Sequence, residues 1–502
     1  MTIAMSDKTR IAVILGTIGL AGAAGLGYFV MGYLPAQKAA GAKAEITAWE
    51  ERLTAARTCL LGPNPASGKS SEALAVREMS PDPWERGTCT KLIGKLSRGM
   101  ADDTGLLPVE HAWMAIDRSA SRVATAFATH IDPMGETGDK RGKPSPLPEA
   151  LEALDDAHAA LRQAAGMSPP GAGIPALPAA QELPIGDGKD RVTQLDGSLP
   201  SAGGLIVFGD LADGRQMQLT LVPGAAPRAQ AVQGAVLRAV PDGSWGAQGR
   251  SGAIAIGPID TAGAPASPLE LPTEGVAEPL IAVGTPASGL VAFAHLGGRL
   301  SIARARGGAF VAEAPIVVSG GVTAQDPDGR GLLAWSVDGA IHGLIVRDGG
   351  STTPVPLGSG EPQPRGCFTS TAAWFSTGDQ FIAFDGTTGA PHVLPEHHLE
   401  GCTREAALLS TSSLHYAVCS EGCRPVDVGG VRWTSAATVV DGKVVAVSER
   451  DHVLRVWREG APPTYFSTTS RLHPRYMTTD GKVIDVIATT DDGVVIARIP
   501  AR

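Results

Sequence analysis

The chain has 502 residues, a net charge of −9 and 5% aromatic residues. This negative balance argues against nucleic acid or an anionic membrane surface as a partner of the folded body. Few aromatic rings are present to stack on sugars or bases, and the 63 glycines and 38 prolines indicate many turns.

Residues 11–34 form an uninterrupted apolar run without a charged residue. A helix that spans a bilayer needs about 20 apolar residues, so we predict a transmembrane anchor here, with residues 1–10 as a cytoplasmic tail. A signal peptide cleaved near Ala21-Gly22-Ala23 is the main alternative, but the apolar run continues well past that site. A buried core helix is disfavoured because every face of the run is apolar.

The cysteines decide the side of the membrane, because the flanking charges do not. Lys8 and Arg10 before the run are balanced by Lys38 and Lys43 after it. Six cysteines in positions that suggest pairs indicate an oxidising compartment, and abundant Ala, Gly, Pro and Arg suggest a GC-rich bacterial genome. We therefore expect a single-pass inner-membrane protein with its body in the periplasm.

Small residues recur within the predicted anchor. Gly19, Ala23 and Gly27 lie four positions apart, which would let two anchor helices pack closely. A homodimer through the anchor is therefore an expectation of the sequence, although small residues are common throughout this chain.

Residues 36–166 show the spacing of amphipathic helices. Apolar residues three and four positions apart share one helix face, which must be buried. Four such sets predict a small helical domain: Ile46, Trp49, Leu53, Ala56 and Leu60; Cys89, Leu92, Leu96 and Met100; Trp113, Ile116, Ala120, Val123 and Phe127; Leu147, Leu151, Leu154, His158 and Leu161. His158 is interpreted as a partly buried core residue.

Two cysteines flank the loop between the first two predicted helices. A disulfide between Cys59 and Cys89 would join these helices and, by closing a loop of about 30 residues, contribute about 3 kcal/mol; two buried free thiols are the alternative. Residues 62–70 (GPNPASGKS) in this loop only partly match a phosphate-binding loop. Five residues rather than four separate Gly62 and Gly68, so we expect no nucleotide site.

Residues 167–189 contain five prolines and no periodicity, and are predicted to be a linker. After it, in residues 190–502, the apolar period changes to two and a unit recurs. Residues 331–335 repeat residues 289–293 after 42 positions, and residues 480–486 repeat residues 441–447 after 39 positions.

A period near 40 built from short strands and glycine turns resembles the β-propeller architecture. A β-sandwich does not repeat its strand pairs at fixed spacing, and a β-solenoid repeats at shorter intervals. No WD dipeptide, kelch glycine pair or quinoprotein tryptophan motif is present, so no named family follows. The resemblance implies seven blades, with six or eight as alternatives, and a closing outer strand supplied from around residues 191–195.

Four further cysteines fit this frame. Cys367 and Cys402 are predicted to begin the first strands of consecutive units, where a bridge would link neighbouring blades. Cys419 and Cys423 flank a hairpin turn and could close a local disulfide, although geometry decides which of the three connectivities forms.

The candidate metal ligands are His392, His397 and His398, which lie close together beside Glu396, Glu400 and Cys402. Imidazole and carboxylate bind zinc or copper, but the spacing matches no helical ligand pair and Pro391 marks a loop. We interpret the segment as a polar blade connection and expect no metal and no cofactor. Asp326-Pro327-Asp328-Gly329 and Asp491-Asp492-Gly493 resemble fragments of calcium loops but lack the full spacing.

The sequence contains no catalytic motif, and we assign no catalytic residue. It favours a multidomain α and β protein: an anchor, a helical bundle and an all-β propeller that binds a protein partner as a scaffold. An extracytoplasmic hydrolase or lyase with its site at the central mouth is the alternative, since such sites leave no local motif. A sensor whose helical bundle dimerises through the anchor is a third reading.

Overall fold

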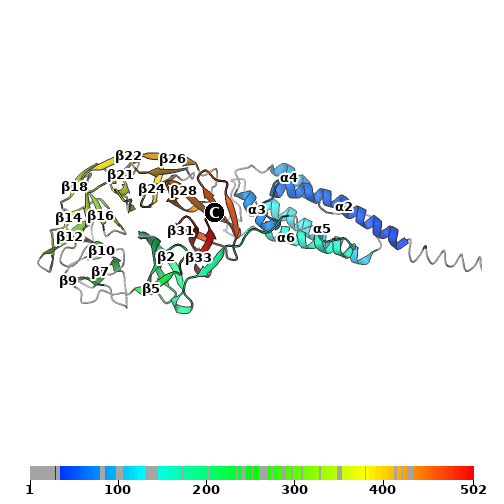
Figure 1. Ribbon diagram of the computed structural model, residues 1–502, viewed down its shortest axis with the longest axis horizontal. Coiled ribbons are helices and arrows are strands. Elements are labelled where there is room, and N and C mark those ends of the chain that lie inside the picture. The colour runs from blue at the N-terminus through cyan, green and yellow to red at the C-terminus, as the bar shows by residue number, and fades with distance from the viewer. Residues whose placement is uncertain are drawn as a thin grey trace, which may run out of the picture. The chain divides into compact units, whose positions relative to one another are not determined.

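The computed structural model describes residue 29 and residues 34–501, except for 80–84, 98–105, 131–144, 171–173, 202–203, 233–235, 239–244, 251–252, 259–268, 273–275, 284–289, 296–297, 307–308, 327–329, 348–352, 364, 379, 412–414, 421 and 428–433. Two compact units are present. The helical unit comprises Met1–Glu78 and Asp82–Leu177, and the propeller unit comprises Met79–Pro81 and Pro178–Arg502 (Figure 1).

The helical unit is built from α2 (Leu34–Leu61), α3 (Ser70–Glu78), α4 (Arg86–Ile93), α5 (Leu107–His130) and α6 (Leu147–Ala164). The predicted apolar faces of α2, α5 and α6 form its core, as their spacing requires. Trp49 and Trp113 meet edge to face at the centre, with ring centroids 5.7 Å apart. The indole nitrogen of Trp49 donates to the carbonyl of Leu96 at 2.6 Å, so a buried polar atom is satisfied.

The helical prediction differs from the structure at two places. α3 was not expected, because its nine residues are too few to establish a periodicity. The set that begins at Cys89 forms only the short α4, whose last residue is Ile93, although Leu96 is still buried in the core. Residues 11–34, the predicted anchor, lie outside the described residues apart from Phe29 and Leu34. Among the helices that the structure describes, none is both long and apolar enough to cross a membrane.

The propeller unit contains eight antiparallel sheets in the described residues, and we call each one a blade. Blades 1 to 4 consist of β2 (Val192–Ser201), β3 (Gly204–Leu211), β4 (Gln216–Leu221) and β5 (Arg228–Val232); β6 (Val236–Arg238), β7 (Trp245–Arg250), β8 (Ala253–Pro258) and β9 (Leu269–Pro272); β10 (Val276–Val283), β11 (Leu290–His295), β12 (Arg299–Arg306), β13 (Ala309–Ala312) and the short β14 (Ile316–Val317); β15 (Gly320–Gln325), β16 (Gly331–Val337), β17 (Ala340–Val346) and β18 (Val355–Ser359).

Blades 5 to 8 repeat the same four-strand order: β19 (Gly366–Phe368), β20 (Ala373–Ser376), β21 (Gln380–Phe384) and β22 (Gly389–Val393); β23 (His397–Cys402), β24 (Ala407–Thr411), β25 (His415–Cys419) and β26 (Cys423–Asp427); β27 (Thr434–Val440), β28 (Lys443–Arg450), β29 (Val453–Arg458) and β30 (Thr464–Ser467); β31 (His473–Thr479), β32 (Val483–Thr490) and β33 (Gly493–Pro500), completed by β1 (Gln181–Pro184). Figure 1 shows these sheets following one another through the unit.

The propeller architecture predicted from the repeats is therefore confirmed, but the favoured count of seven blades is wrong and the alternative of eight is correct. The error arises where the sequence repeat has no clear register. The region between residues 205 and 280 spans the greater part of two blades and enters a third.

The last blade is completed by the start of the domain, as expected, but by a different strand. β1 pairs antiparallel with β33, from Gln181 opposite Arg498 to Pro184 opposite Val495. The predicted closing segment, residues 191–195, instead begins β2 of blade 1. β1 consequently lies inside the predicted linker, 167–189, and removes the open edge that β33 would otherwise present.

Apolar side chains between neighbouring blades form the cores of this unit. One cluster joins blades 7 and 8, another joins blades 8 and 1, and others join blades 3 to 7 in successive pairs. The alternating pattern of each strand thus buries both faces of a blade against its neighbours, which explains the continuous apolar runs of second strands such as β16.

All three predicted disulfides are present: Cys59–Cys89, Cys367–Cys402 and Cys419–Cys423. Cys59 and Cys89 link α2 to α4, with Cα atoms 5.5 Å apart. Cys367 of β19 and Cys402 of β23 link the first strands of blades 5 and 6, although Cys402 ends its strand instead of beginning it.

Candidate functional site

The three candidate metal ligands are not brought together as a cluster. His392 on β22 stacks on Trp374 of β20, with ring centroids 5.0 Å apart. His397 and His398 are neighbours on β23, where the Nδ1 of His397 lies 2.9 Å from the carbonyl of Pro395. Within the described residues, no group of three or more histidine, cysteine or acidic side chains could hold a metal ion.

Stacking of histidine on tryptophan recurs in the preceding blade. Trp335 of β16 and His342 of β17 stack with ring centroids 5.9 Å apart. In both blades a partly buried imidazole covers a buried indole, so His392 and His342 contribute to packing.

The loop that only partly resembles a phosphate loop instead holds a later segment of the chain. Gly68 donates its N–H to the carbonyl of Pro175 at 3.2 Å. A Cβ atom at Gly68 would lie 2.1 Å from the carbonyl oxygen of Ile174, so only glycine allows this approach. The buried carboxylate of Glu72 accepts hydrogen bonds from the hydroxyl of Ser67 at 2.5 Å and the N–H of Leu177 at 2.9 Å.

The segments that partly resemble calcium loops lie within single blades: Asp326 directly follows β15 of blade 4, and Asp491 and Asp492 lie in the turn between β32 and β33 of blade 8. The buried carboxylate of Asp326 pairs with Arg330. Arg330 also donates to the carbonyl of Thr369 in the next blade at 2.7 Å and lies 4.9 Å from the ring centroid of Phe368. A cation therefore satisfies Asp326 and links blades 4 and 5.

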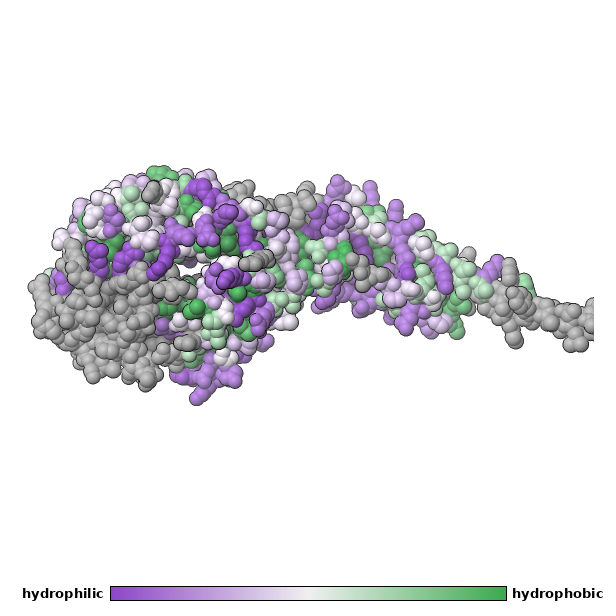
Figure 2. Space-filling view, in the orientation of Figure 1, coloured by the Kyte–Doolittle hydropathy of each residue, from purple (hydrophilic) through white to green (hydrophobic). Residues whose placement is uncertain are grey.

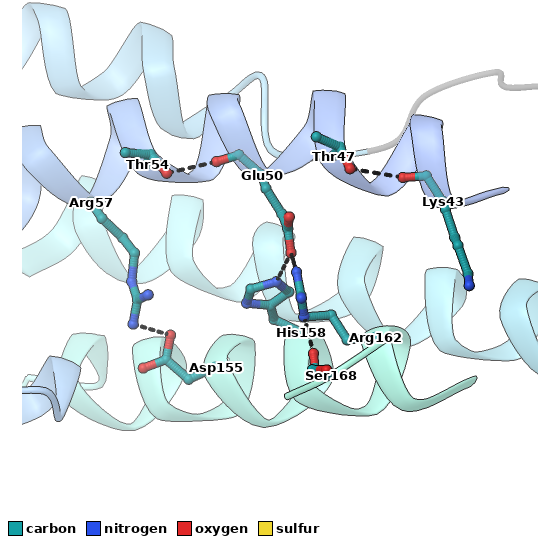
Figure 3. Close-up of polar contacts among 9 residues, drawn as sticks. All are labelled: Lys43, Thr47, Glu50, Thr54, Arg57, Asp155, His158, Arg162 and Ser168. Atoms are coloured by element: carbon teal, nitrogen blue, oxygen red, sulfur yellow. Dashed lines mark hydrogen bonds and ion pairs between the residues drawn. The ribbon is translucent and has the colours of Figure 1, made fainter. Parts of the chain in front are cut away.

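A polar seam, which we define as Glu50, Arg57, Asp155, His158 and Arg162, lies between α2 and α6 (Figure 3). One oxygen of Glu50 contacts the Nε2 of His158 at 2.7 Å and accepts a hydrogen bond from Arg162 at 2.5 Å. Figure 3 shows Arg57 and Asp155 further along the same pair of helices, and they are joined at 2.8 Å.

Every charge in the polar seam thus has a partner of opposite sign or a hydrogen bond. Burial by itself raises the pKa of Glu50, but the hydrogen bonds from His158 and Arg162 outweigh it, and the pKa lies below its ordinary value. For Asp155 the balance is reversed, because burial raises its pKa in spite of the nearby Arg57. The seam aligns two helices and its titrating groups are held by salt bridges.

Blade 7 holds a carboxyl group whose pKa lies far above its ordinary value. Burial raises the pKa of Glu449, near the end of β28, to about 7. Asp451 raises it further, while Arg471 and a hydrogen bond from the N–H of His452 at 3.0 Å oppose the rise.

The turn beside Glu449 has an unusual backbone. Asp451 and His452 both have positive φ, 43° and 64°, in the two-residue turn that joins β28 to β29. Such a turn matches the right-handed twist of the strands but is disfavoured for residues other than glycine, asparagine and aspartate. The hydrogen bond from His452 to Glu449 helps to hold it.

Blade 7 also contains buried donors without acceptors. In the described part of the chain, the Nε of Arg455, one terminal nitrogen of Arg458 and the hydroxyl of Thr464 are buried and make no hydrogen bond. A buried polar atom without a partner costs about 1–3 kcal/mol. Three such atoms within two adjacent strands distinguish blade 7 from the polar seam.

Sequence reasoning missed this concentration of perturbed groups. Residues 453–458 (VLRVWR) read as an ordinary alternating strand, since arginine on the outer face of a strand is normally solvated. The burial of these arginines follows from the packing of blade 7 between blades 6 and 8, which the sequence of one strand does not show.

No protein-family model matches the chain, and no curated protein does. Solved structures with β-propeller folds do match. The WD40 domain of SCAP from fission yeast aligns with 9% identity and a TM-score of 0.39, covering 64% of this chain and 98% of that chain. Virginiamycin B lyase from Staphylococcus aureus aligns with 11% identity and a TM-score of 0.34, covering 63% and 98%. The β-propeller domain of the Trilobed protease from Pyrococcus furiosus aligns with 8% identity and a TM-score of 0.34, covering 62% and 96%.

Proposed function

We propose that this protein is a scaffold whose propeller binds a protein partner and whose N-terminal apolar segment, residues 11–34, anchors it in a bacterial inner membrane with the body in the periplasm. The observation that carries the proposal is the pairing of β1 with β33, which closes the propeller. Its last blade combines strands from both ends of the domain, because β1 pairs with β33. A frame locked in this way supports a binding surface of constant shape.

Polar contacts between blades support the same reading. The carboxylate of Glu405 in blade 6 accepts the N–H of Gly442 in blade 7 at 2.8 Å. Asp485 in blade 8 accepts the N–H of Gly224 in blade 1 at 3.0 Å, and Arg498 donates to the carbonyl of Ala225 at 2.6 Å. Together with the Cys367–Cys402 disulfide, these contacts oppose sliding of one blade past another.

The surface indicates what kind of partner would fit. Hydrophilic and hydrophobic residues are interspersed over the described part of the propeller's visible face (Figure 2). The exposed large apolar side chains described in this unit are separate valines: Val222, Val311, Val317 and Val393. We therefore expect a polar, reversible interface of the kind that transient complexes use.

Site-specific photo-crosslinking in native membranes tests this role. A photoreactive residue at Val317 or Val393 should capture the same partner, while the same residue at Met114 of the helical unit serves as the matched control. Capture of one partner from both propeller positions and not from Met114 supports the scaffold. No reproducible adduct from either valine, or adducts from Met114 alone, contradicts it.

The compartment and the anchor need separate tests. If the body is periplasmic, thiol titration of the folded, unreduced full chain should find no free cysteine, and protease added to spheroplasts should degrade the body. Several free thiols, or full protection from protease, would contradict that location. Substituting Gly19, Ala23 and Gly27 with leucine should abolish crosslinked dimers if the anchor carries a homodimer.

An extracytoplasmic propeller enzyme, a hydrolase or lyase, remains the second candidate because of Glu449. A carboxyl group with a pKa of about 7 is suited to general acid or base catalysis at neutral pH. A screen of the purified protein on glycan and peptide substrates, with Glu449→Gln as the control, tests this function. Turnover that the substitution abolishes would favour the enzyme over the scaffold.

A further inference from the structure

Three polar side chains form a row across blade 7, and we call it the arginine row: Ser448 of β28, Arg455 of β29 and Tyr465 of β30. Ser448 lies directly opposite Arg455, and Arg455 directly opposite Tyr465, in the antiparallel register. Residues paired in this way project from the same face of a sheet. Ser448 and Arg455 are 3% and 5% exposed, whereas Tyr465 at the end of the row is only partly buried.

The guanidinium of Arg455 lacks an anionic partner among the residues that the structure describes. Tyr465 makes a side-chain hydrogen bond to it, but its Nε makes none, and no carboxylate in the described ranges forms an ion pair with it. Burial lowers the pKa of Arg455 and raises that of Tyr465, as expected for groups held away from water. A buried, uncompensated charge is unfavourable.

Three other shielded arginines of the chain do have a carboxylate partner. Arg498 pairs with Asp485 through two nitrogens at 2.8 and 3.0 Å. Arg330 pairs with Asp326, and Arg162 pairs with Glu50. Carboxylate partners are therefore present for these three arginines, whereas β29 carries two arginines, Arg455 and Arg458, for which the described residues provide none.

The neighbours of Arg455 in the row can complete an anion site. Among the described residues, the hydroxyl of Ser448 donates only to the weak acceptor Sδ of Met79, at 3.9 Å. The row therefore offers one guanidinium and two hydroxyls from one face. A guanidinium presents its Nε and terminal N–H groups as a planar fork that matches the two oxygens of a carboxylate.

We propose that the arginine row is a carboxylate-binding site, filled by a small organic acid or by an acidic side chain of a bound peptide. The site requires no catalysis and does not depend on the scaffold role. The carboxylate of the ligand supplies a negative charge opposite the guanidinium of Arg455. The hydroxyls of Ser448 and Tyr465, on either side of Arg455, donate hydrogen bonds to it.

Thermal unfolding of the full, disulfide-intact chain tests the site. The melting temperature of the propeller transition is measured in chloride and then with added succinate, or with a blocked tetra-glutamate peptide, at matched ionic strength. We expect a saturable rise of a few degrees. A rise with succinate identifies a free acid as sufficient, and a rise with the peptide alone identifies a peptide side chain as the source of the carboxylate.

Arg455→Met should abolish the rise, whereas Arg424→Met, which removes an exposed arginine paired with Glu459, should retain it. No rise with either probe in the unsubstituted protein overturns the proposal, as does an equal rise in Arg455→Met.

A second measurement separates a ligand site from a structural arginine. In chloride, Arg455→Met should melt at the same temperature as the unsubstituted protein or above it, because it removes an uncompensated buried charge. Arg498→Met should melt well below, since it leaves Asp485 buried without its cation. If Arg455→Met loses as much as Arg498→Met, then Arg455 holds the fold together and the proposal is wrong.

Discussion

The polar seam of the helical unit and blade 7 of the propeller both place charges away from water, but they resolve them differently. In the seam, Glu50 meets His158 and Arg162, and Arg57 meets Asp155, so that charges of opposite sign pair across two helices. In blade 7, Glu449 has a raised pKa and Arg455 retains an unbonded Nε. Paired charges hold two helices in position, whereas a buried charge without a partner can be stabilised by binding a ligand or by a change of protonation.

The pH dependence of blade 7 is the largest expected difference. The pKa of Glu449 is about 7 in the folded protein and 4.5 as the reference value. Between these pH values the folded state binds a proton that the unfolded state does not, so stability falls as pH rises from about 4.5 to 7. The gap corresponds to at most roughly 3 kcal/mol.

Glu449→Gln should remove this dependence and make the propeller more stable than the unsubstituted protein at pH 8. Urea unfolding between pH 5 and pH 8 measures it, with Asp385→Asn as a control for an exposed carboxyl, since backbone hydrogen bonds from Thr388 and Thr387 lower the Asp385 pKa to about 2. Equal pH slopes in Glu449→Gln and the unsubstituted protein would show that Glu449 titrates normally.

Removal of one cation from the polar seam should come next in size. Arg57 donates to Asp155 at 2.8 Å and to the hydroxyl of Ser70 at 2.9 Å, and so links α2 to α6 and α3. Arg57→Met leaves Asp155 partly buried without its partner and should cost about 2 kcal/mol, less than a fully buried pair because both side chains reach solvent. Faster hydrogen exchange over α2 and α6, with no change in blade 7, is the expected readout.

Acid should affect the polar seam in the opposite direction from blade 7. The folded-state pKa of Glu50 lies below 4.5, so its contribution is fully present above that value and is lost as pH falls through the folded pKa. Glu50→Gln should therefore cost about 1–2 kcal/mol at pH 7 and nothing at the lowest pH. A loss that persists unchanged at low pH would mean that Glu50 contributes through uncharged contacts and not through its charge.

The sequence predicts most of the frame of this molecule because the frame depends on local periodicity. Steps of three and four residues identify the buried faces of α2, α5 and α6, and repeats near 40 residues identify the propeller. The cysteine positions predict all three disulfides, since strands and helices already bring those pairs near one another.

What the sequence does not predict depends on pairing between distant segments. β1 was read as linker because four residues that end in proline show no strand period, yet β33 pairs with them. Gly68 resembled part of a phosphate loop, and only the approach of Ile174 explains it. The burial of Arg455 has no local sign in the sequence, because no pattern within β29 reveals that blade 7 is covered on both faces.

The smallest expected effect tests whether solvent exposure accounts for the contrast between the two regions. Arg424 of blade 6 pairs with Glu459 of blade 7, but 49% of its side chain is exposed. Water screens such a pair, so Arg424→Gln should cost less than about 1 kcal/mol, and the loss should vanish in about 1 M salt. Glu459 keeps its hydrogen bond from the N–H of Val444 at 3.2 Å and is not left unsatisfied.

Chemical unfolding at low and high salt measures the effect. A loss as large as that of Arg57→Met, and insensitive to salt, would mean that an exposed contact holds blade 7 as firmly as the seam holds its helices. Burial would then no longer explain why one region tolerates unpaired charges and the other does not.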